Sequence, residues 1–198
     1  MALYSFPSRS SNKRNEVVRA IFWDKDGVIN RMVQREGYKS APWHVSEFVF
    51  LDHVQEAFDI TYRIGFENFI VTNQPDVYAG NMHHEQLSHM MKMCIRWLKV
   101  SDVRIAYERG SAWYKPNNGM IEALIRTYKV DRHHSFMVGD RWKDIVAGYN
   151  SGLRNILINS FYHYNPPEKH IHISPDKTAA DLIEAVDIIE MEFKNGIR

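Results

Sequence analysis

Two pairs of acidic residues stand directly after apolar stretches of the chain. Asp24 and Asp26 are separated by one residue, and Asp140 and Asp144 are four residues apart. Carboxylates gathered at one place repel one another unless a divalent cation neutralises them, and oxygen ligands without histidine or cysteine nearby suit magnesium. The acidic pattern therefore predicts a Mg²⁺ site.

A metal-bound carboxylate can also act as a nucleophile towards a phosphate ester. We expect Asp24 to attack phosphorus and form an aspartyl phosphate, and Asp26 to protonate the leaving group and later activate water. Gly27 lets the chain turn and leaves neighbouring amides free to face the anion. The hydroxyl of Thr72 is expected to bind the transferring phosphoryl group, whose charge Lys115 balances.

Strands and helices alternate along the chain. Apolar runs predict strands at 17–23, 69–72, 103–107, 135–138 and 155–158, and helical spacing predicts helices at 53–64, 82–98, 118–128 and 142–150. This order is typical of a doubly wound (Rossmann-like) α/β fold, with a parallel sheet of about five strands and helices on both faces. Ligands of such sheets bind beyond the carboxyl ends of the strands, where the acidic pairs lie.

The two ends of the chain carry no further candidate site residues. A short strand and a closing helix are expected within 171–192. Residues 1–15 are predicted to be a polar N-terminal tail, and 16–198 one domain.

Composition excludes several classes of protein. Lys and Arg number 25 and Asp and Glu 24, so the net charge of +1 gives no general attraction to nucleic acid or to an anionic membrane. Cys94 is the only cysteine, which excludes an internal disulfide and a multi-cysteine zinc site. Without an apolar run long enough for export or membrane spanning, we expect a cytoplasmic monomer or small homo-oligomer.

Four segments carry a resemblance to a known superfamily. IFWDKDGVIN, IVTNQ, YKPNNGM and VGDRWKDIVAG resemble, in order and spacing, the motifs of the haloacid dehalogenase (HAD) superfamily of phosphohydrolases, over about residues 17–160. The resemblance implies a HAD-like fold with Asp24 as nucleophile and Asp26 as general acid and base. It also implies that Asp24, the Asp26 carbonyl and Asp140 hold Mg²⁺, while Asp144 supports Asp140 and Lys115.

Further stretches resemble one subgroup, the heptose bisphosphate and histidinol-phosphate phosphatases. These are DGVIN, REGY, FVFLDHVQEAF, and TNQPDVYAG followed by HHEQL. The intervals between motifs leave no room for a separate cap domain, so the loops 30–46, 74–81 and 108–114 should select the small phosphorylated substrate. Residues expected to contact the substrate or its phosphate are Lys25, Gly27, Arg35, Tyr38, Trp43, Asn73, Gln74, Arg109 and Arg141.

One departure from this subgroup bears on the substrate. The resembled heptose phosphatases carry a zinc-binding loop before the third motif, whereas this chain has ERGSAWY at 108–114, so no zinc is expected. A sugar phosphate or bisphosphate is the favoured substrate, with histidinol phosphate as an alternative. A polynucleotide 3′-phosphatase and a non-catalytic phosphometabolite-binding protein also stay open, although near-neutral charge and the intact motifs argue against them.

Overall fold

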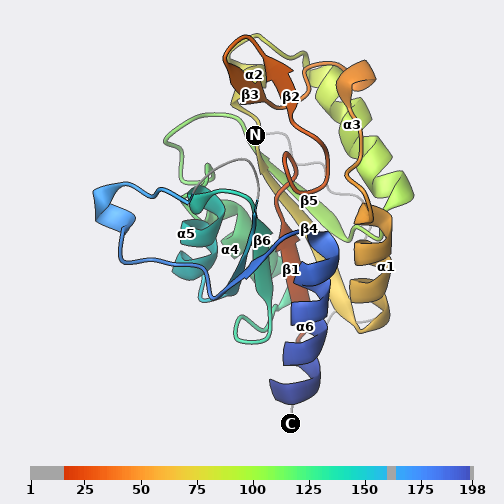
Figure 1. Cartoon of the computed structure of the whole chain (residues 1–198), viewed down its shortest axis with the longest axis vertical. Coiled ribbons are helices and arrows are strands. Elements are labelled where there is room, and N and C mark those ends of the chain that lie inside the picture. Colours follow the sequence, from red (N-terminus) through yellow and green to blue (C-terminus); the bar gives the residue numbers. More distant parts are fainter. Residues whose placement is uncertain (1–15, 160–163, 197–198) are drawn as a thin grey trace.

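The computed structural model describes residues 16–159 and 164–196 (Figure 1). The predicted tail at 1–15 lies outside the described residues. A six-stranded sheet, parallel throughout, has the strand order β5-β4-β1-β6-β7-β8. Its strands are β1 Arg19–Trp23, β4 Phe66–Asn73, β5 Asp102–Ala106, β6 Phe136–Gly139, β7 Arg154–Ile158 and β8 Lys177–Ala179. The parallel α/β prediction is confirmed, with one strand more than the five apolar runs indicated.

The register of β1 and β6 brings their carboxyl ends to nearly the same level, and β4 continues three residues further to Asn73. Trp23 at the end of β1 lies opposite Ile70 of β4 and Val138 of β6. The residues from Asp24 onward after β1 and from Asp140 onward after β6 therefore leave the sheet at nearly one level. The local sequence thus places the acidic pairs at a common edge.

Helices cover both faces of the sheet. One face carries α1 Val54–Arg63, α3 His84–Trp97 and α6 Leu182–Gly196, and the other carries α4 Gly119–Tyr128 and α5 Trp142–Asn150 (Figure 1). Neighbouring strand residues alternate between these faces. The ring of Trp23 stacks on Phe58 of α1 with centroids 5.0 Å apart, whereas Phe22 contacts Phe69 on the opposite side at 5.3 Å.

The segment expected to be a loop at 30–46 contains a β-hairpin. β2 Val33–Arg35 pairs antiparallel with β3 Tyr38–Ser40, and Gly37 in the turn has φ 77°. Beyond the carboxyl ends of the sheet, this hairpin lies beside α2 Pro75–Tyr78 (Figure 1). Short 3₁₀ helices, η1 Val45–Glu47 and η2 Glu168–His170, complete the elements. Among the described residues, no helix is long and apolar enough to cross a membrane.

Close packing of α5 on the sheet depends on Gly148. A Cβ atom at this position would lie 1.9 Å from Asn155 Oδ1 and 2.7 Å from Met137 Cβ. We predict that Gly148→Ala lowers the free energy of unfolding by about 1–2 kcal/mol, because overpacking outweighs the gain of roughly 1 kcal/mol in helix propensity. Denaturant unfolding measures the change.

The matched control for this prediction is Asn150→Ala at the exposed end of the same helix. It should change stability by less than about 0.5 kcal/mol. Equal stability of the two variants would show that the α5–sheet contact tolerates a methyl group.

Candidate active site

A buried ion-pair network joins three segments at the edge of the sheet. The ammonium group of Lys115, in the loop between β5 and α4, lies 2.6 Å from Asp24 Oδ1 and 2.5 Å from Asp144 Oδ1. It also donates a hydrogen bond to the backbone oxygen of Val71 in β4, at 2.8 Å. Only 2% of Lys115 is exposed. A buried cation with two carboxylates and a carbonyl around it is fully paired, so it fixes all three segments in place.

The carboxylates of this network hold an excess of negative charge. Burial raises the pKa of Asp24 to about 6, although Lys115 acts in the opposite direction. Burial also raises the pKa of Asp140 well above its usual value, and the charges of Asp24 and Asp144 add to the effect. For Lys115, burial alone would lower the pKa, but Asp144 and Asp24 outweigh it and raise the value. A further cation near the acids would relieve the repulsion among them.

The acids fit a hard divalent cation. Carboxylate oxygens of Asp24, Asp140 and Asp144 lie within 4.8 Å of one another, and all three residues are buried. Both oxygens of Asp144 have protein partners, since Oδ1 accepts from Lys115 and Oδ2 accepts from the backbone nitrogen of Arg141 at 3.0 Å. The residues suited to hold a metal are therefore Asp24 and Asp140, with Asp144 orienting the network.

Gly27 brings the turn after β1 against this cluster. Its φ is 96°, and a Cβ atom there would lie 2.3 Å from Asp140 Oδ2. Only glycine accommodates both the left-handed backbone and the close approach of the carboxylate. The position predicted for phosphate contact thus also lets the loop after β6 meet the loop after β1.

Asp26 stands in a different environment from Asp24. Its Oδ1 accepts hydrogen bonds from Lys25 Nζ at 2.5 Å and Asn30 Nδ2 at 3.0 Å, and its Oδ2 accepts from Gln74 Nε2 at 2.6 Å. The carboxylate is therefore held by three donors, and neither of its oxygens belongs to the acidic cluster. This geometry leaves the Asp26 backbone carbonyl as the group that the family resemblance assigns to the metal.

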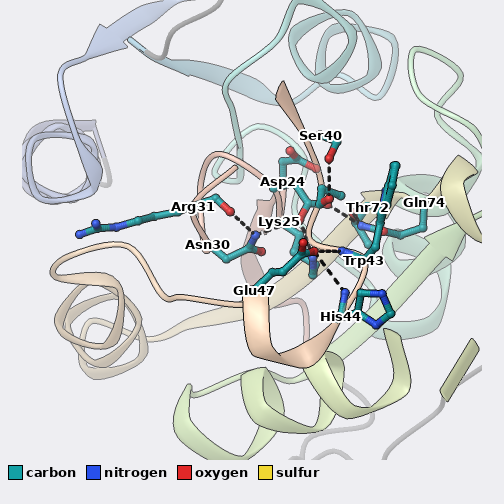
Figure 2. Close-up of polar contacts among 12 residues, drawn as sticks. Asp24, Lys25, Asn30, Arg31, Ser40, Trp43, His44, Glu47, Thr72 and Gln74 are labelled. Carbon is teal, nitrogen blue, oxygen red and sulfur yellow. Dashed lines mark hydrogen bonds and ion pairs between the residues drawn. The ribbon is translucent and has the colours of Figure 1, made fainter. Parts of the chain in front are cut away.

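Three residues predicted to bind phosphate or substrate have buried side chains. Lys25 is fully buried, with Nζ between Asp26 and the ring of Phe48, so its ammonium group contacts the acid in this structure. Gln74, also fully buried, donates to Asp26 and at 2.9 Å to the hydroxyl of Thr72 (Figure 2). Gln74 and Lys25 thus position Asp26, and Thr72 lies beneath the cleft with 1% of its surface exposed.

Arg35, predicted to contact substrate, instead holds the hairpin to η1. It forms a two-pronged ion pair with Glu47 at 3.1 and 2.9 Å, and its Nε donates to Ser40 at 2.7 Å. Its guanidinium stacks on Trp43, 3.6 Å from the ring centroid. Backbone nitrogens of Trp43 and His44 also donate to Glu47 (Figure 2), and Arg35 lowers the pKa of Glu47 to about 2. The side chains of Arg35 and Trp43 thus contact other protein groups in this structure, and their contact with substrate stays a prediction.

The cleft above the acids has a volume of about 240 Å³. Of the predicted residues, it brings together Asp24, Asp26, Tyr38, Asn73, Arg109, Lys115, Arg141 and Asp144. Asn73 also forms two hydrogen bonds with the backbone of Lys115. Its Oδ1 accepts from the Lys115 nitrogen and its Nδ2 donates to the Lys115 carbonyl, both at 3.0 Å.

Sequence reasoning missed several residues of the cleft wall, namely Lys39, Asp76, Tyr114 and Lys143. Burial lowers the pKa of Lys143, and the positive charges of Arg109 and Arg141 lower it further. The signal for Lys143 was its position inside the fourth motif, between Asp140 and Asp144. Lys39 comes from the hairpin, which no apolar pattern indicated.

Comparison with known proteins identifies the class to which this fold and site belong. A family model described as HAD-hydrolase-like matches residues 112–185. A D-glycero-alpha-D-manno-heptose-1,7-bisphosphate 7-phosphatase from Burkholderia mallei is 32% identical over 155 residues, 71% of this chain and 79% of its own length. A D-glycero-D-manno-heptose-1,7-bisphosphate 7-phosphatase from Chlorobaculum tepidum is 28% identical over 86% of this chain and 94% of its own. The chain belongs to the HAD-like phosphatases, in the family of these heptose bisphosphate phosphatases.

Solved structures agree on the fold. The D,D-heptose 1,7-bisphosphate phosphatase of B. bronchiseptica, solved with magnesium and phosphate, aligns with a TM-score of 0.73 and 19% identity. The alignment covers 88% of this chain and 99% of that one. A second D,D-heptose 1,7-bisphosphate phosphatase, from Burkholderia thailandensis, aligns with a TM-score of 0.60 and 18% identity over 87% of this chain and 98% of that one.

The charge excess of the acidic cluster should reduce the stability of the metal-free protein. A carboxylate whose pKa is raised on folding favours the folded state while protonated, and that contribution is lost as pH rises through the raised pKa. We predict that Asp140→Asn raises the melting temperature in chelator at pH 7, because one buried charge is removed. Below pH 4 the difference from the wild type should disappear. Thermal unfolding across pH measures both effects.

The same comparison of melting temperatures is made with magnesium in place of chelator. The ion should raise the melting temperature of the wild type and much less that of Asp140→Asn, because the variant lacks one carboxylate ligand. The exposed Asp187→Asn on α6 serves as control and should behave like the wild type in both conditions. A lower melting temperature for Asp140→Asn in chelator at pH 7 would contradict the analysis.

Proposed function

We propose that this phosphatase removes the 7-phosphate of D-glycero-D-manno-heptose 1,7-bisphosphate in a magnesium-dependent reaction, with Asp24 as nucleophile. The substrate rests on the relatives from Burkholderia mallei and Chlorobaculum tepidum, both of which carry this activity in their names. The observation that carries the chemistry is the buried contact of Lys115 with Asp24, which holds one carboxylate at the floor of an open cleft.

Asp24 is suited to attack phosphorus. Its Oδ1 is held by Lys115, which leaves its other oxygen for the reaction, and 8% of the residue is exposed at the cleft. In the first step a bond would form between Asp24 and phosphorus while the bond from phosphorus to the sugar oxygen breaks. The product of this step is an aspartyl phosphate and a sugar alcohol.

Asp26 is suited to move the proton. In the first step it would donate a proton to the departing sugar oxygen, and in the second it would take one from the water that attacks the aspartyl phosphate. Gln74, Lys25 and Asn30 fix the direction of its carboxylate through both steps. Asp24 and Asp140 would hold Mg²⁺, which would supply positive charge to offset the acids and the phosphate oxygens.

The zinc-binding loop of the resembled enzymes has no counterpart at residues 108–114. That stretch contains neither cysteine nor histidine, and Cys94 lies buried on α3, where burial raises the pKa of its thiol to about 12. We therefore expect activity with magnesium alone. Arg109 in the shortened loop still lines the cleft.

Asp24→Asn should abolish phosphate release. The amide is a poor nucleophile, so we predict a loss of turnover of about 10³-fold or more, with the fold retained. Phosphate release from heptose 1,7-bisphosphate, measured with magnesium and with chelator, tests this, and exposed Asp187→Asn is the control. Turnover by Asp24→Asn at the wild-type rate would overturn the assignment of the nucleophile.

The substrate is tested by a panel at equal concentration. It contains both anomers of heptose 1,7-bisphosphate, other sugar phosphates, histidinol phosphate and a 3′-phosphorylated oligonucleotide. We expect one heptose bisphosphate anomer to have the highest kcat/KM. A higher value for histidinol phosphate or for the oligonucleotide would keep the chemistry and reject the substrate.

A further inference from the structure

The cleft wall carries five cations as well as acids, and two of these cations form no ion pair within the described part of the chain. The cations of the cleft are Lys39, Arg109, Lys115, Arg141 and Lys143. Lys115 is paired with Asp24 and Asp144, and Arg141 lies 3.9 Å from Asp140. Arg109 and Lys143, by contrast, form no ion pair with a carboxylate of the described residues.

Two aromatic rings lie near the ammonium group of Lys143. Its Nζ lies 5.6 Å from the ring centroid of Tyr114 and 5.7 Å from that of Trp142. The residue is partly buried on the first turn of α5, so its ammonium group has lost part of its hydration. A partly desolvated cation without an acidic partner binds an incoming anion more strongly than a fully hydrated surface lysine does.

Arg109 approaches the same part of the cleft from another segment. It is exposed in the loop 108–114, and its charge acts on both Tyr114 and Lys143. Tyr114 is 7% exposed and lines the cleft beside the two cations. Two cations and an aromatic residue from two segments thus line the same cleft as the acids that hold Lys115.

We propose that Lys143, with Arg109 and Tyr114, forms a subsite for the anionic group at the non-reacting end of the substrate. This inference rests on the proposed function, in which the substrate carries two phosphates and only one reacts at Asp24. Lys143 is then a specificity-determining residue that favours bisphosphates over the corresponding monophosphates. It supplies binding energy at a distance from the bond that breaks.

A matched pair of substrates tests the subsite. Heptose 1,7-bisphosphate and heptose 7-phosphate present the same reacting phosphate and differ only in the second one. We predict that Lys143→Gln raises KM for the bisphosphate about tenfold or more, with little change in kcat, because a charge-assisted contact is lost. For the monophosphate, kcat/KM should stay within about twofold of the wild type. Lys143→Arg should keep most of the preference, and exposed Lys92→Gln on α3 should leave it unchanged.

Either of two outcomes would overturn the subsite. An equal loss for both substrates would place Lys143 at the transferring phosphoryl group, and no change for either would make it a surface residue. A binding measurement keeps the test independent of turnover. Calorimetry measures the affinity of Asp24→Asn for glucose 1,6-bisphosphate and for glucose 6-phosphate. The same two affinities are then measured for the double variant that also carries Lys143→Gln.

The binding measurement separates the two proposals. If the wild type hydrolyses no heptose phosphate, the proposed function fails. The subsite still stands if Asp24→Asn prefers the bisphosphate and Lys143→Gln removes that preference. Without any preference in Asp24→Asn, the subsite is rejected whatever the substrate proves to be.

Discussion

One buried ammonium group determines how the site can be built. Lys115 contacts acids from the loop after β1 and from α5, together with a carbonyl of β4, so a single charge ties the central strands to the helix beyond them. Removing any one partner would leave another buried charge uncompensated, which is far more costly than never having buried the group. The same edge also holds the close approach of Asp140 to Gly27.

The two acids of the first motif differ because their surroundings differ. Asp24 meets Lys115 and other carboxylates, and burial holds its proton to higher pH. Asp26 meets only donors, from Lys25, Asn30 and Gln74, which fix its orientation. Two identical side chains one residue apart therefore lie in different electrostatic surroundings. A cation bound at Asp24 would offset the neighbouring acids and favour the ionised form that attack requires.

The sequence was sufficient to predict the sheet, its helices and the meeting of Asp24, Lys115, Asp140 and Asp144, because each follows from apolar runs and from the rule for parallel strand ends. The directions of Lys25 and Gln74 were not predictable, since a residue type does not say whether its side chain enters the cleft or the core. The ion pair of Arg35 was not predictable for a related reason. Its partner Glu47 is twelve residues away, and only the folded hairpin brings them together.

The hairpin β2–β3 contributes to the wall of the cleft but not to the buried acids at its floor. It supplies Tyr38 and Lys39 to the cleft but forms a two-stranded sheet of its own, and Arg35, Trp43 and Glu47 attach it to η1. Mutations at its tip can therefore change what enters the cleft without disturbing the buried acids below. Selection can tune substrate choice in such a segment while the reaction itself is inherited unchanged.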